Sequence, residues 1–259
     1  MSIVEISPVS IIPVVSPEIF KGHEDSSFWL GRVATGNDIS RPDYYDALMK
    51  FRGNVYVTEL EFLSEDHLDE KGREIDEYDQ YSIEFMAVEN VKEEDDLARV
   101  VASGRLITKE NPDTPLPIEH FFPEVFDGKP LPDNAVEVSR FIARHKEDST
   151  QHALALSIIR AMTHYSVDTQ VEADYCIIEK PLIKLLGSIG LPMDVLGEPK
   201  NIPEYGGTLY PIRINPYKII DSVTKDKTGN ILLKRFFSRE AENKGEGFYP
   251  TSLTGGTNG

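Results

Sequence analysis

The stretch "AVEVSRFIA", residues 135–143, has the two-residue period and the β-branched and aromatic side chains of a β-strand. The next periodic stretch, "STQHALALSIIRAMTHYSV" at 149–167, changes to helical spacing, with an apolar stripe of Leu154, Ile158, Met162 and Tyr165. Either Ser149 or Thr150 can cap the start of this helix. The stretch "DYCIIE", at 174–179, is apolar enough for a buried strand. Together these patterns predict a strand, a helix and a second strand in succession.

Further elements are predicted on both sides of this unit. They are a helix at 43–63, strands at 82–89 and 98–107, a short amphipathic helix at 181–190 and a last strand at 208–214. Arg52 is expected on the first helix or where that helix ends. In the strand at 82–89, Ile83, Phe85 and Ala87 alternate with polar partners, and Gly190 closes the short helix. The pattern predicts an α/β or α+β fold.

Composition limits the possible partners. The chain has 259 residues, of which 40 % are apolar, enough for one sizeable core. Its formal net charge of -17 opposes binding to nucleic acid phosphates. The single cysteine, Cys176, cannot form an internal disulfide, and its apolar surroundings favour a small buried side chain over a nucleophile. We expect a cytoplasmic protein that binds no nucleic acid and, without a run of eighteen apolar residues, has no membrane span.

The two ends of the sequence differ from its middle. The apolar stretch at 2–20 is interrupted by three prolines and lacks the basic first segment of a secretory signal. We expect residues 1–40 to form an extension that packs on the domain or on a second subunit. Residues 221–259 are predicted to be a C-terminal extension, at least partly disordered, because the stretch at 244–259 lacks core-forming side chains. The domain itself is predicted to span 41–220.

An acidic stretch, "GREIDEYDQY" at 72–81, precedes the strand at 82–89. It holds four carboxylates within six positions, but its spacing does not match a calcium-binding EF-hand loop, because Gly72 stands before the cluster. The histidines and the cysteine show no zinc spacing, so no metal site is predicted. A second acidic stretch, at 91–99, is expected to be a solvated loop between two strands.

Charged residues also fall inside the predicted strands. Arg105 lies in "SGRLI", and Glu137 and Arg140 lie in "EVSRF" among apolar neighbours. A buried ionised group is costly unless it is paired. We therefore predict an interior network that joins the arginines, including Arg52, to carboxylates chosen from Glu74, Asp76, Asp79 and Glu137. Spacing alone leaves open a purely structural network that fixes a loop over a sheet.

The order of these residues resembles that of a known family. Arg52, Tyr56 and Phe62, then "EIDEYD", "SGRLI" and "HFFPEVFDGKPLPDNAVEVSRF", are similar to the acyl-homoserine-lactone synthases, the autoinducer synthases of bacterial quorum sensing. The similarity runs from about Tyr44 to about Ile214. Tyr56 stands where phenylalanine is common in that family, and Phe62 where tryptophan is typical. The related N-acyl amino acid synthases, which tend to read "GFL" where this chain has "EFL" at 61–63, therefore remain an alternative.

The resemblance implies the fold of the GNAT N-acyltransferases. In that fold a mixed, twisted sheet is flanked by helices, and two central parallel strands splay apart to receive a pantetheine arm. The strands at 135–143 and 174–179 would be this pair, and the helix between them would supply the crossover that a parallel pair requires. Backbone amides around Phe141 and Ile142 would then bind the thioester carbonyl.

The resemblance also implies roles for individual residues. An amine attacks an acyl thioester, so the site needs a base, for which Glu74 and Glu137 are the candidates, and donors for an oxyanion. The residues assigned to catalysis are Glu74, Glu137, Arg105 and Arg140. The residues assigned to substrate binding are Arg52, Tyr56, Phe62, Asp76, Asp79, Ser139, Phe141 and Ile142. The acidic stretch would hold the arginines and make the amine pocket negative.

The substrates follow from the same resemblance. The amine would be S-adenosylmethionine, the acyl donor would be acyl carrier protein or acyl-CoA, and no cofactor would be bound permanently. An acidic carrier protein requires a local basic face, which Arg144, Lys146, Lys180 and Lys184 could provide, although ordinary solvated side chains are the alternative. Two other functions stay open: an N-acyl amino acid synthase or other GNAT acyltransferase, and a GNAT-like domain that binds without turnover.

Overall fold

The computed structural model describes residues 12–14, 28–34, 42–89, 99–109, 114–225 and 237. The proline-interrupted stretch at 2–20, the acidic loop at 91–99 and the tail at 244–259 lie outside the described residues, apart from residues 12–14 and 99.

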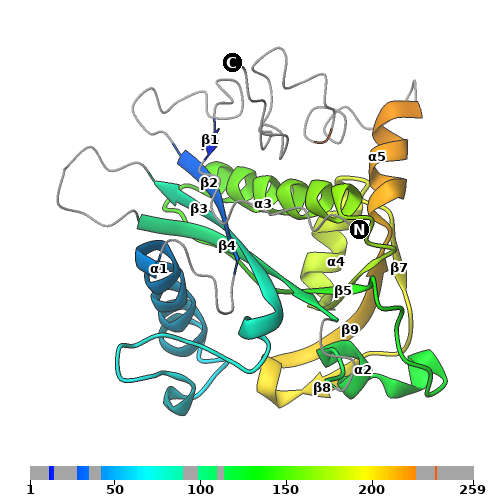
Figure 1. Cartoon of the computed structure of the whole chain (residues 1–259), viewed down its shortest axis with the longest axis horizontal. Helices are drawn as coiled ribbons and strands as arrows, with labels where there is room; N and C mark the ends of the chain where they lie inside the picture. The colour runs from blue at the N-terminus through cyan, green and yellow to red at the C-terminus, as the bar shows by residue number, and fades with distance from the viewer. Residues whose placement is uncertain are drawn as a thin grey trace, which may run out of the picture.

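A mixed sheet with helices on both faces forms the described part of the molecule (Figure 1). Its strands are β1 (Ile12–Val14), β2 (Phe28–Ala34), β3 (Ser82–Glu89), β4 (Arg99–Thr108), β5 (Val136–Ala143), β6 (Asp174–Glu179), β7 (Met193–Val195), β8 (Lys200–Ile202) and β9 (Gly207–Ile214). Its α-helices are α1 (Pro42–Gly53), α2 (Pro117–Phe121), α3 (Asp148–Asp168), α4 (Lys180–Ser188) and α5 (Pro216–Lys225). A π-helix, Asn54–Glu59, continues α1.

The strand order is β1-β2-β3-β4-β5-β6-β9-β7, and β8 pairs with β9 beside this path. Neighbours from β1 to β5 are antiparallel, β5 and β6 are parallel, and β9 is antiparallel to its partners. The helix α3 makes the crossover between β5 and β6, as the sequence predicts. The predicted fold class is confirmed.

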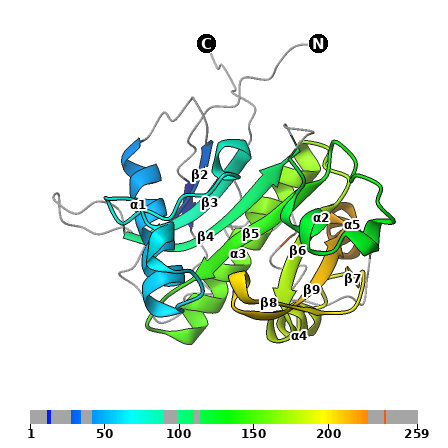
Figure 2. The same ribbon diagram turned by 90° about the horizontal axis from the view of Figure 1, so that it is seen from below.

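The two parallel strands separate along their length. They are paired at only three positions, from Val136↔Asp174 to Val138↔Cys176. Beyond Val138, β5 continues beside β4 to Ala143, and β6 continues beside β9 to Glu179. A V-shaped gap therefore opens in the sheet between β5 and β6, whose courses can be followed in Figure 2.

Apolar side chains pack on both faces of the sheet. The predicted stripe of α3 packs on one face, where Leu154 and Ile158 are fully buried against Phe85 of β3. The helix α1 packs on the opposite face, where Leu48 contacts Met86 of the same strand (Figure 1). We therefore name these the α3 face and the α1 face. Because both are covered, β3 does not alternate as predicted.

Three other local predictions differ from the structure. The helix predicted at 43–63 ends as an α-helix at Gly53 and continues as the π-helix. The helix predicted to be capped by Ser149 or Thr150 begins at Asp148, with Glu147 at the N-cap position. Thr150 lies inside the first turn, where its hydroxyl donates to Glu147 at 3.4 Å, so it is not the N-cap residue. The strand β2 was not predicted; it pairs with β3 over seven residues and extends the sheet.

Candidate active site

Buried ion pairs on the α1 face form the first part of the site. Arg52, in the last turn of α1, is fully buried. Its Nε donates to Glu74 at 2.6 Å, and its Nη1 donates to Asp79 at 2.7 Å and to Glu84 at 2.9 Å. Glu74 and Asp79 lie in the acidic stretch that follows α1, whereas Glu84 lies on β3. Arg52 therefore ties the acidic stretch to both the helix and the sheet.

Arg105, on β4, holds the other end of the acidic stretch. Its Nη1 donates to Asp76 at 2.6 Å and to Asp79 at 2.8 Å. Its Nε donates to the hydroxyl of Ser139, on β5, at 2.8 Å. The side chain of Arg105 is only 1 % exposed. Its hydrogen bonds to protein groups therefore take the place of hydrogen bonds to water.

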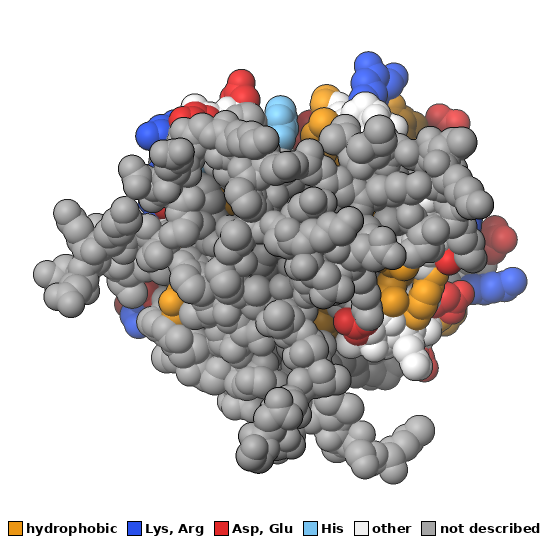
Figure 3. Space-filling model, turned by 90° about the horizontal axis from the view of Figure 1, so that it is seen from above, with side chains coloured by type: hydrophobic (Ala, Val, Ile, Leu, Met, Phe, Trp, Pro, Cys, Tyr) orange, Lys and Arg blue, Asp and Glu red, His pale blue; other side chains and the backbone are white. Residues whose placement is uncertain are grey.

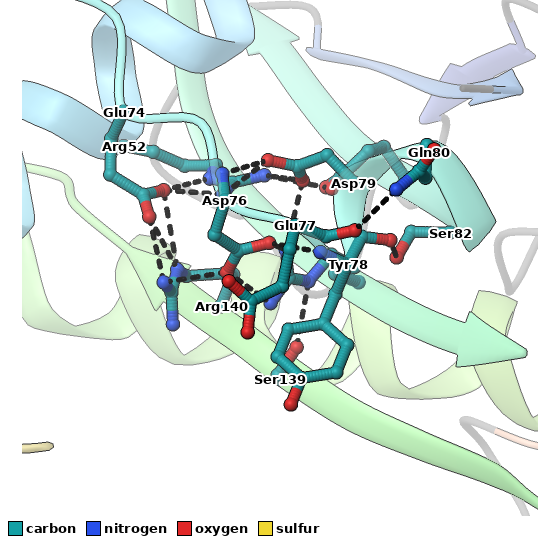
Figure 4. Close-up of polar contacts among 12 residues, drawn as sticks. Arg52, Glu74, Asp76, Glu77, Tyr78, Asp79, Gln80, Ser82, Ser139 and Arg140 are labelled. Carbon is teal, nitrogen blue, oxygen red and sulfur yellow. Dashed lines mark hydrogen bonds and ion pairs between the residues drawn. The ribbon is translucent and has the colours of Figure 1, made fainter. Parts of the chain in front are cut away.

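Arg140, on β5, completes the set (Figure 4). Its Nη2 donates to Glu74 at 2.7 Å and to Asp76 at 2.9 Å. We call these seven side chains the ion-pair network: Arg52, Arg105, Arg140, Glu74, Asp76, Asp79 and Glu84. The predicted pairing of the arginines with the acidic stretch is confirmed, and Glu84 is a member that the sequence analysis missed.

An irregularity in β5 explains how Arg140 reaches the network. Neighbouring strand residues normally point to opposite faces, yet both Ser139 and Arg140 bond to groups on the α1 face. The register with β4 shifts between Ser103 and Arg105, and Arg140 has φ of 48°. Such a conformation is strained for a residue other than glycine and persists only where its surroundings hold it. Here the conformation is stabilised by the ion pairs of Arg140 and by a hydrogen bond that the Ser103 hydroxyl donates to the Arg140 carbonyl at 3.1 Å.

The network is close to neutral. Although burial acts in the opposite direction, the guanidinium groups hold the pKa of Glu74, Asp76 and Asp79 below the usual range. Burial raises the pKa of Glu84 to about 8 in spite of Arg52. Three carboxylates with lowered pKa values therefore face three guanidinium groups, and burial favours the neutral form of Glu84. Within the acidic stretch, Glu74, Asp76 and Asp79 are therefore each balanced by arginines.

Glu137 lies apart from the network, contrary to the prediction that it could pair with an arginine. It is two residues before Ser139 on β5, and its carboxylate accepts a hydrogen bond from the backbone N–H of Ile118 at 2.8 Å. Among the described residues, no cation forms an ion pair with it. Burial raises its pKa to about 8. Glu137 is therefore a carboxyl group that can exchange a proton near neutral pH.

A cavity of about 640 Å³ runs through the gap between β5 and β6. Glu137, Ser139 and Arg140 line it on the α1 face. On the other side, Ile159 and Met162 of α3 line it. One continuous cavity therefore connects the two faces of the sheet beside Glu137.

Aromatic side chains surround the cavity on the α1 face. Tyr56, from the π-helix, lies under the guanidinium of Arg140, whose carbon is 5.4 Å from the ring centroid. Phe62 packs against Gly206, where an added Cβ would lie 2.6 Å from the ring and φ is 82°. Tyr205, next to that glycine, also lines the cavity. The sequence analysis named Tyr56 and Phe62 but missed Tyr205, which ends a short 3-10 helix in "PEYGG" and lies in no periodic segment.

The backbone of β5 supplies further polar groups. Phe141 and Ile142 line the cavity in the part of β5 that has no pairing with β6. The groups of residues 139–143 that face β6 therefore lack a strand partner, which is the arrangement that the prediction for Phe141 and Ile142 requires. Such groups are hydrogen-bond donors and acceptors available to a ligand.

The predicted carrier-binding residues lie at one edge of the sheet. Arg144 and Lys146 follow β5, and Lys180 and Lys184 lie in α4, directly after β6. Because β5 and β6 are parallel, the two pairs share the edge at which the gap is widest. Arg144 is bound by Glu59 at 3.0 Å, whereas the three lysines are exposed. In the view from above, the coloured basic and acidic side chains lie interspersed around the margin of the molecule (Figure 3).

Other candidate chemistry is limited within the described residues. No three His, Cys, Asp or Glu side chains there are grouped to hold a metal ion. None of the described helices is long and apolar enough to cross a membrane. Cys176 lines the cavity, and burial raises its thiol pKa far above neutrality, which keeps it protonated.

Comparisons with known proteins agree with this geometry. The family model described as autoinducer synthase matches residues 38–212, more than half of the chain. The solved structure of BjaI, a CoA-dependent acyl-homoserine lactone synthase with SAM and isopentyl-CoA, is 20 % identical with a TM-score of 0.56, over 71 % of this chain and 81 % of that chain. The acyl-homoserine lactone synthase LasI is 18 % identical with a TM-score of 0.55, over 74 % and 90 %. FeeM, an N-acyl amino acid synthase from uncultured soil microbes, is 12 % identical with a TM-score of 0.53, over 76 % and 94 %. No curated protein sequence matches the chain.

Proposed function

The chain belongs to the autoinducer synthase family, and from that premise we propose that it transfers an acyl group from a thioester to the amine of S-adenosylmethionine, giving an acyl-homoserine lactone. The observation that carries this proposal is the cavity that joins both faces of the sheet beside Glu137. In this assignment the amine lies on the α1 face, the acyl chain lies on the α3 face, and the thioester carbonyl lies in the gap between them.

We propose Glu137, rather than Glu74, as the base. Glu74 is fully buried, is bonded to Arg52 and Arg140, and has a lowered pKa, so it is a poor proton acceptor. Glu137 lines the cavity, and its pKa is raised to about 8. A bound cation would shift that pKa downward and leave the carboxylate ionised next to the ammonium group.

The acyl transfer is a conventional addition and elimination. The ammonium group loses a proton to Glu137, directly or through water, and its nitrogen forms a bond to the thioester carbon. Unpaired backbone donors of β5 near Phe141 and Ile142 stabilise the oxyanion, and one such donor is typically worth about 3 kcal/mol. The C–S bond of the thioester then breaks, and the departing thiolate takes the second proton that the nitrogen loses as it becomes an amide.

Ring closure follows on the same substrate. The carboxylate of the acylated S-adenosylmethionine attacks its own γ-carbon, so that a C–O bond forms as the bond to the sulfonium breaks. Methylthioadenosine leaves as a neutral product. We propose that Tyr56, Phe62 and Tyr205 bind the adenosine and sulfonium groups, since aromatic faces favour both stacking and cations.

The donor is proposed to be an acyl carrier protein, with acyl-CoA as the alternative. The first turn of α3 lies next to the mouth of the cavity, which Gln151 and His152 line. The N-cap residue of α3 is Glu147, and Asp148 follows it. Carboxylates at this position repel a pyrophosphate that a helix N-terminus would otherwise attract. Lys146 and Lys180 would instead contact the acidic carrier.

A second candidate is an enzyme that makes an open N-acyl amino acid. Phenylalanine at position 62, where the lactone synthases typically have tryptophan, favours it, and FeeM shows that the same fold carries that activity. We propose that either reaction takes place in the cytoplasm, in a catalytic domain of residues 41–220.

Mass spectrometry of the products decides between these functions. Purified protein is incubated with S-adenosylmethionine, a mixture of free amino acids and either acyl carrier protein or CoA thioesters. Methylthioadenosine together with an acyl lactone supports the proposal. An acylated amino acid without methylthioadenosine supports the second candidate, and no acylated product with any donor supports a domain that binds without turnover.

A further inference from the structure

The α3-face half of the cavity is lined mostly by apolar side chains, and it also contains a buried carboxyl group. Ile159, Leu186, Ile214 and Ile219 line this half, as expected for a site that holds a hydrocarbon chain. Asp174, the first residue of β6, lines it as well. Its side chain shares a face of β6 with Cys176 and Ile178, because strand residues alternate in direction.

Asp174 lies on the closed side of the gap. It is paired with Val136 at the position farthest from the gap, which opens beyond Val138↔Cys176, whereas residues 139–143 lie at the open end. The side chain is 3 % exposed, and its Oδ1 has no hydrogen-bond partner within the described part of the chain. The hydroxyl of Ser166, on α3, is fully buried and likewise lacks a partner there.

Such an arrangement calls for a ligand. Buried polar atoms in folded proteins are almost always paired, and exceptions concentrate at functional sites. Burial raises the pKa of Asp174 to about 7, with the nearby Ser166 hydroxyl opposing this shift, which agrees with a carboxyl group that lacks a cationic partner. An unbranched alkyl chain would offer no polar partner to the Oδ1 atom of Asp174.

We propose that Asp174 and Ser166 form a subsite for a hydroxyl group carried by the acyl chain far from its thioester. A hydroxyl group in the cavity can donate to the Asp174 carboxyl group, which lines the cavity, while the Ser166 hydroxyl can bond to Asp174 from the side of α3. A charged group at the same place would lose far more hydration in an apolar cavity. This inference rests on the proposed function, since it assumes that the cavity holds the acyl chain.

A competition assay on the wild-type protein tests the subsite without any substitution. Equal amounts of plain and terminally hydroxylated acyl donors of the same length, from six to twelve carbons, are supplied together. The product ratio then reports the ratio of kcat/KM. At one or more lengths, we expect the hydroxylated product to exceed the plain one by about 10-fold or more, because a site built to bond a hydroxyl rejects an analogue without it. Equal or greater use of the plain donor at every length overturns the proposal.

Two variants identify the groups responsible. Asp174→Leu is expected to abolish the preference and to use plain chains at least as well as the wild type does. Thr163→Val is the matched control: Thr163 lines the same cavity, but its hydroxyl is already bonded to the Ile159 carbonyl at 2.9 Å. This control should keep the preference, and a preference that survives Asp174→Leu overturns the assignment.

A binding measurement separates this inference from the proposed function. Non-reactive thioether analogues of the two donors are titrated calorimetrically with the wild-type protein. About 10-fold tighter binding of the hydroxylated analogue supports the subsite even if no acyl transfer is detected, in which case only the proposed function fails. Equal dissociation constants overturn the subsite while leaving acyl transfer unaffected.

Discussion

The site contains two kinds of buried carboxyl group. In the ion-pair network, Glu74, Asp76 and Asp79 are each bonded to arginines, and their pKa values are lowered. In the cavity, Glu137 and Asp174 form no ion pair with any described cation, and burial raises their pKa values to about 8 and about 7. The same functional group thus serves as a fixed counter-charge in one region and as a free hydrogen-bonding or proton-accepting group in the other.

The difference indicates which group carries which task. A buried carboxylate with two guanidinium partners is held in its ionised form and is a weak proton acceptor, but it can hold a strained strand in place. The bonds of Arg140 to Glu74 and Asp76 do this next to the gap in the sheet. A carboxyl group without a cation is costly to bury, so its presence in a cavity points to a role in binding or chemistry.

Removing an arginine from the network is expected to have the largest effect. Arg105→Ala should lower the free energy of unfolding by about 3–5 kcal/mol and abolish turnover, because Asp76 loses its main partner while it stays mostly buried. Arg140→Ala should act in the same way. Urea denaturation and initial rates measure both effects.

The control for this test is an exposed ion pair. Arg213 is bonded to Asp194 at 2.8 Å, and both side chains are more than 40 % exposed. Arg213→Ala should change stability by no more than about 1 kcal/mol. If Arg105→Ala proved as mild as this control, the network would not be a buried stabilising unit.

The second prediction separates the two kinds of carboxyl group. Glu137→Gln should lower kcat by about 100-fold or more while leaving the melting temperature near or above that of the wild type, because an amide cannot accept the proton but needs less hydration. Glu74→Gln and Asp79→Asn should lower the melting temperature as well as the rate, since each leaves a guanidinium partly unpaired. A fully active Glu137→Gln enzyme would return the base to Glu74 or to a bound water.

The sequence predicted most of this architecture but not the division between the two kinds of carboxyl group. The strands β3 and β6 and the stripe of α3 were predicted because periodicity and β-branched residues report burial directly. Buried arginines in strands predicted the network, because burial of a charge demands a partner. These signals are local in sequence or follow from charge balance.

The features that were missed depend on contacts between distant segments. Glu84 looked like the polar member of an alternating strand, and only the position of α1 over β3 shows that it is buried. The bulge that turns Arg140 toward the network depends on its register with β4. Tyr205 and Asp174 line the cavity, which no local sequence pattern encodes.

The free energy of unfolding should also depend on pH, in opposite directions for carboxyl groups with a raised pKa and for those with a lowered pKa. A raised folded-state pKa, as for Glu137, gives a contribution that is complete below the unfolded value of 4.5 and is lost as pH rises toward 8. In the network, the folded-state pKa values of Asp76 and Asp79 are lowered. Their contribution to stability is therefore present above the unfolded pKa values near 4 and is lost as pH falls.

The unfolding free energy is therefore expected to fall between pH 5 and pH 8 by no more than about 1.4 kcal/mol per pH unit for each carboxyl group with a raised pKa, namely Glu137 and Asp174 in the cavity and Glu84 in the network. Glu137→Gln should make the fall in unfolding free energy between pH 5 and pH 8 less steep. Asp79→Asn should leave that fall unchanged and alter only the loss of stability below about pH 4. Urea denaturation at several pH values measures both slopes. An identical profile for the wild type and Glu137→Gln would contradict the raised pKa.

The smallest expected effect is on the docking of the acyl donor, which involves neither the ion-pair network nor the carboxyl groups of the cavity. Lys180 is exposed at the start of α4, beside the edge of the sheet at which the gap opens. Lys180→Glu should raise KM for an acyl carrier protein several-fold at low salt, because it reverses one charge facing an acidic partner, and the effect should shrink as salt screens it. The matched control is Lys129→Glu, at an exposed position before the other end of β5, which should leave KM unchanged. If the two variants raised KM equally, net charge rather than a local docking face would govern the encounter; if neither did, the lysines at this edge would be ordinary solvated side chains.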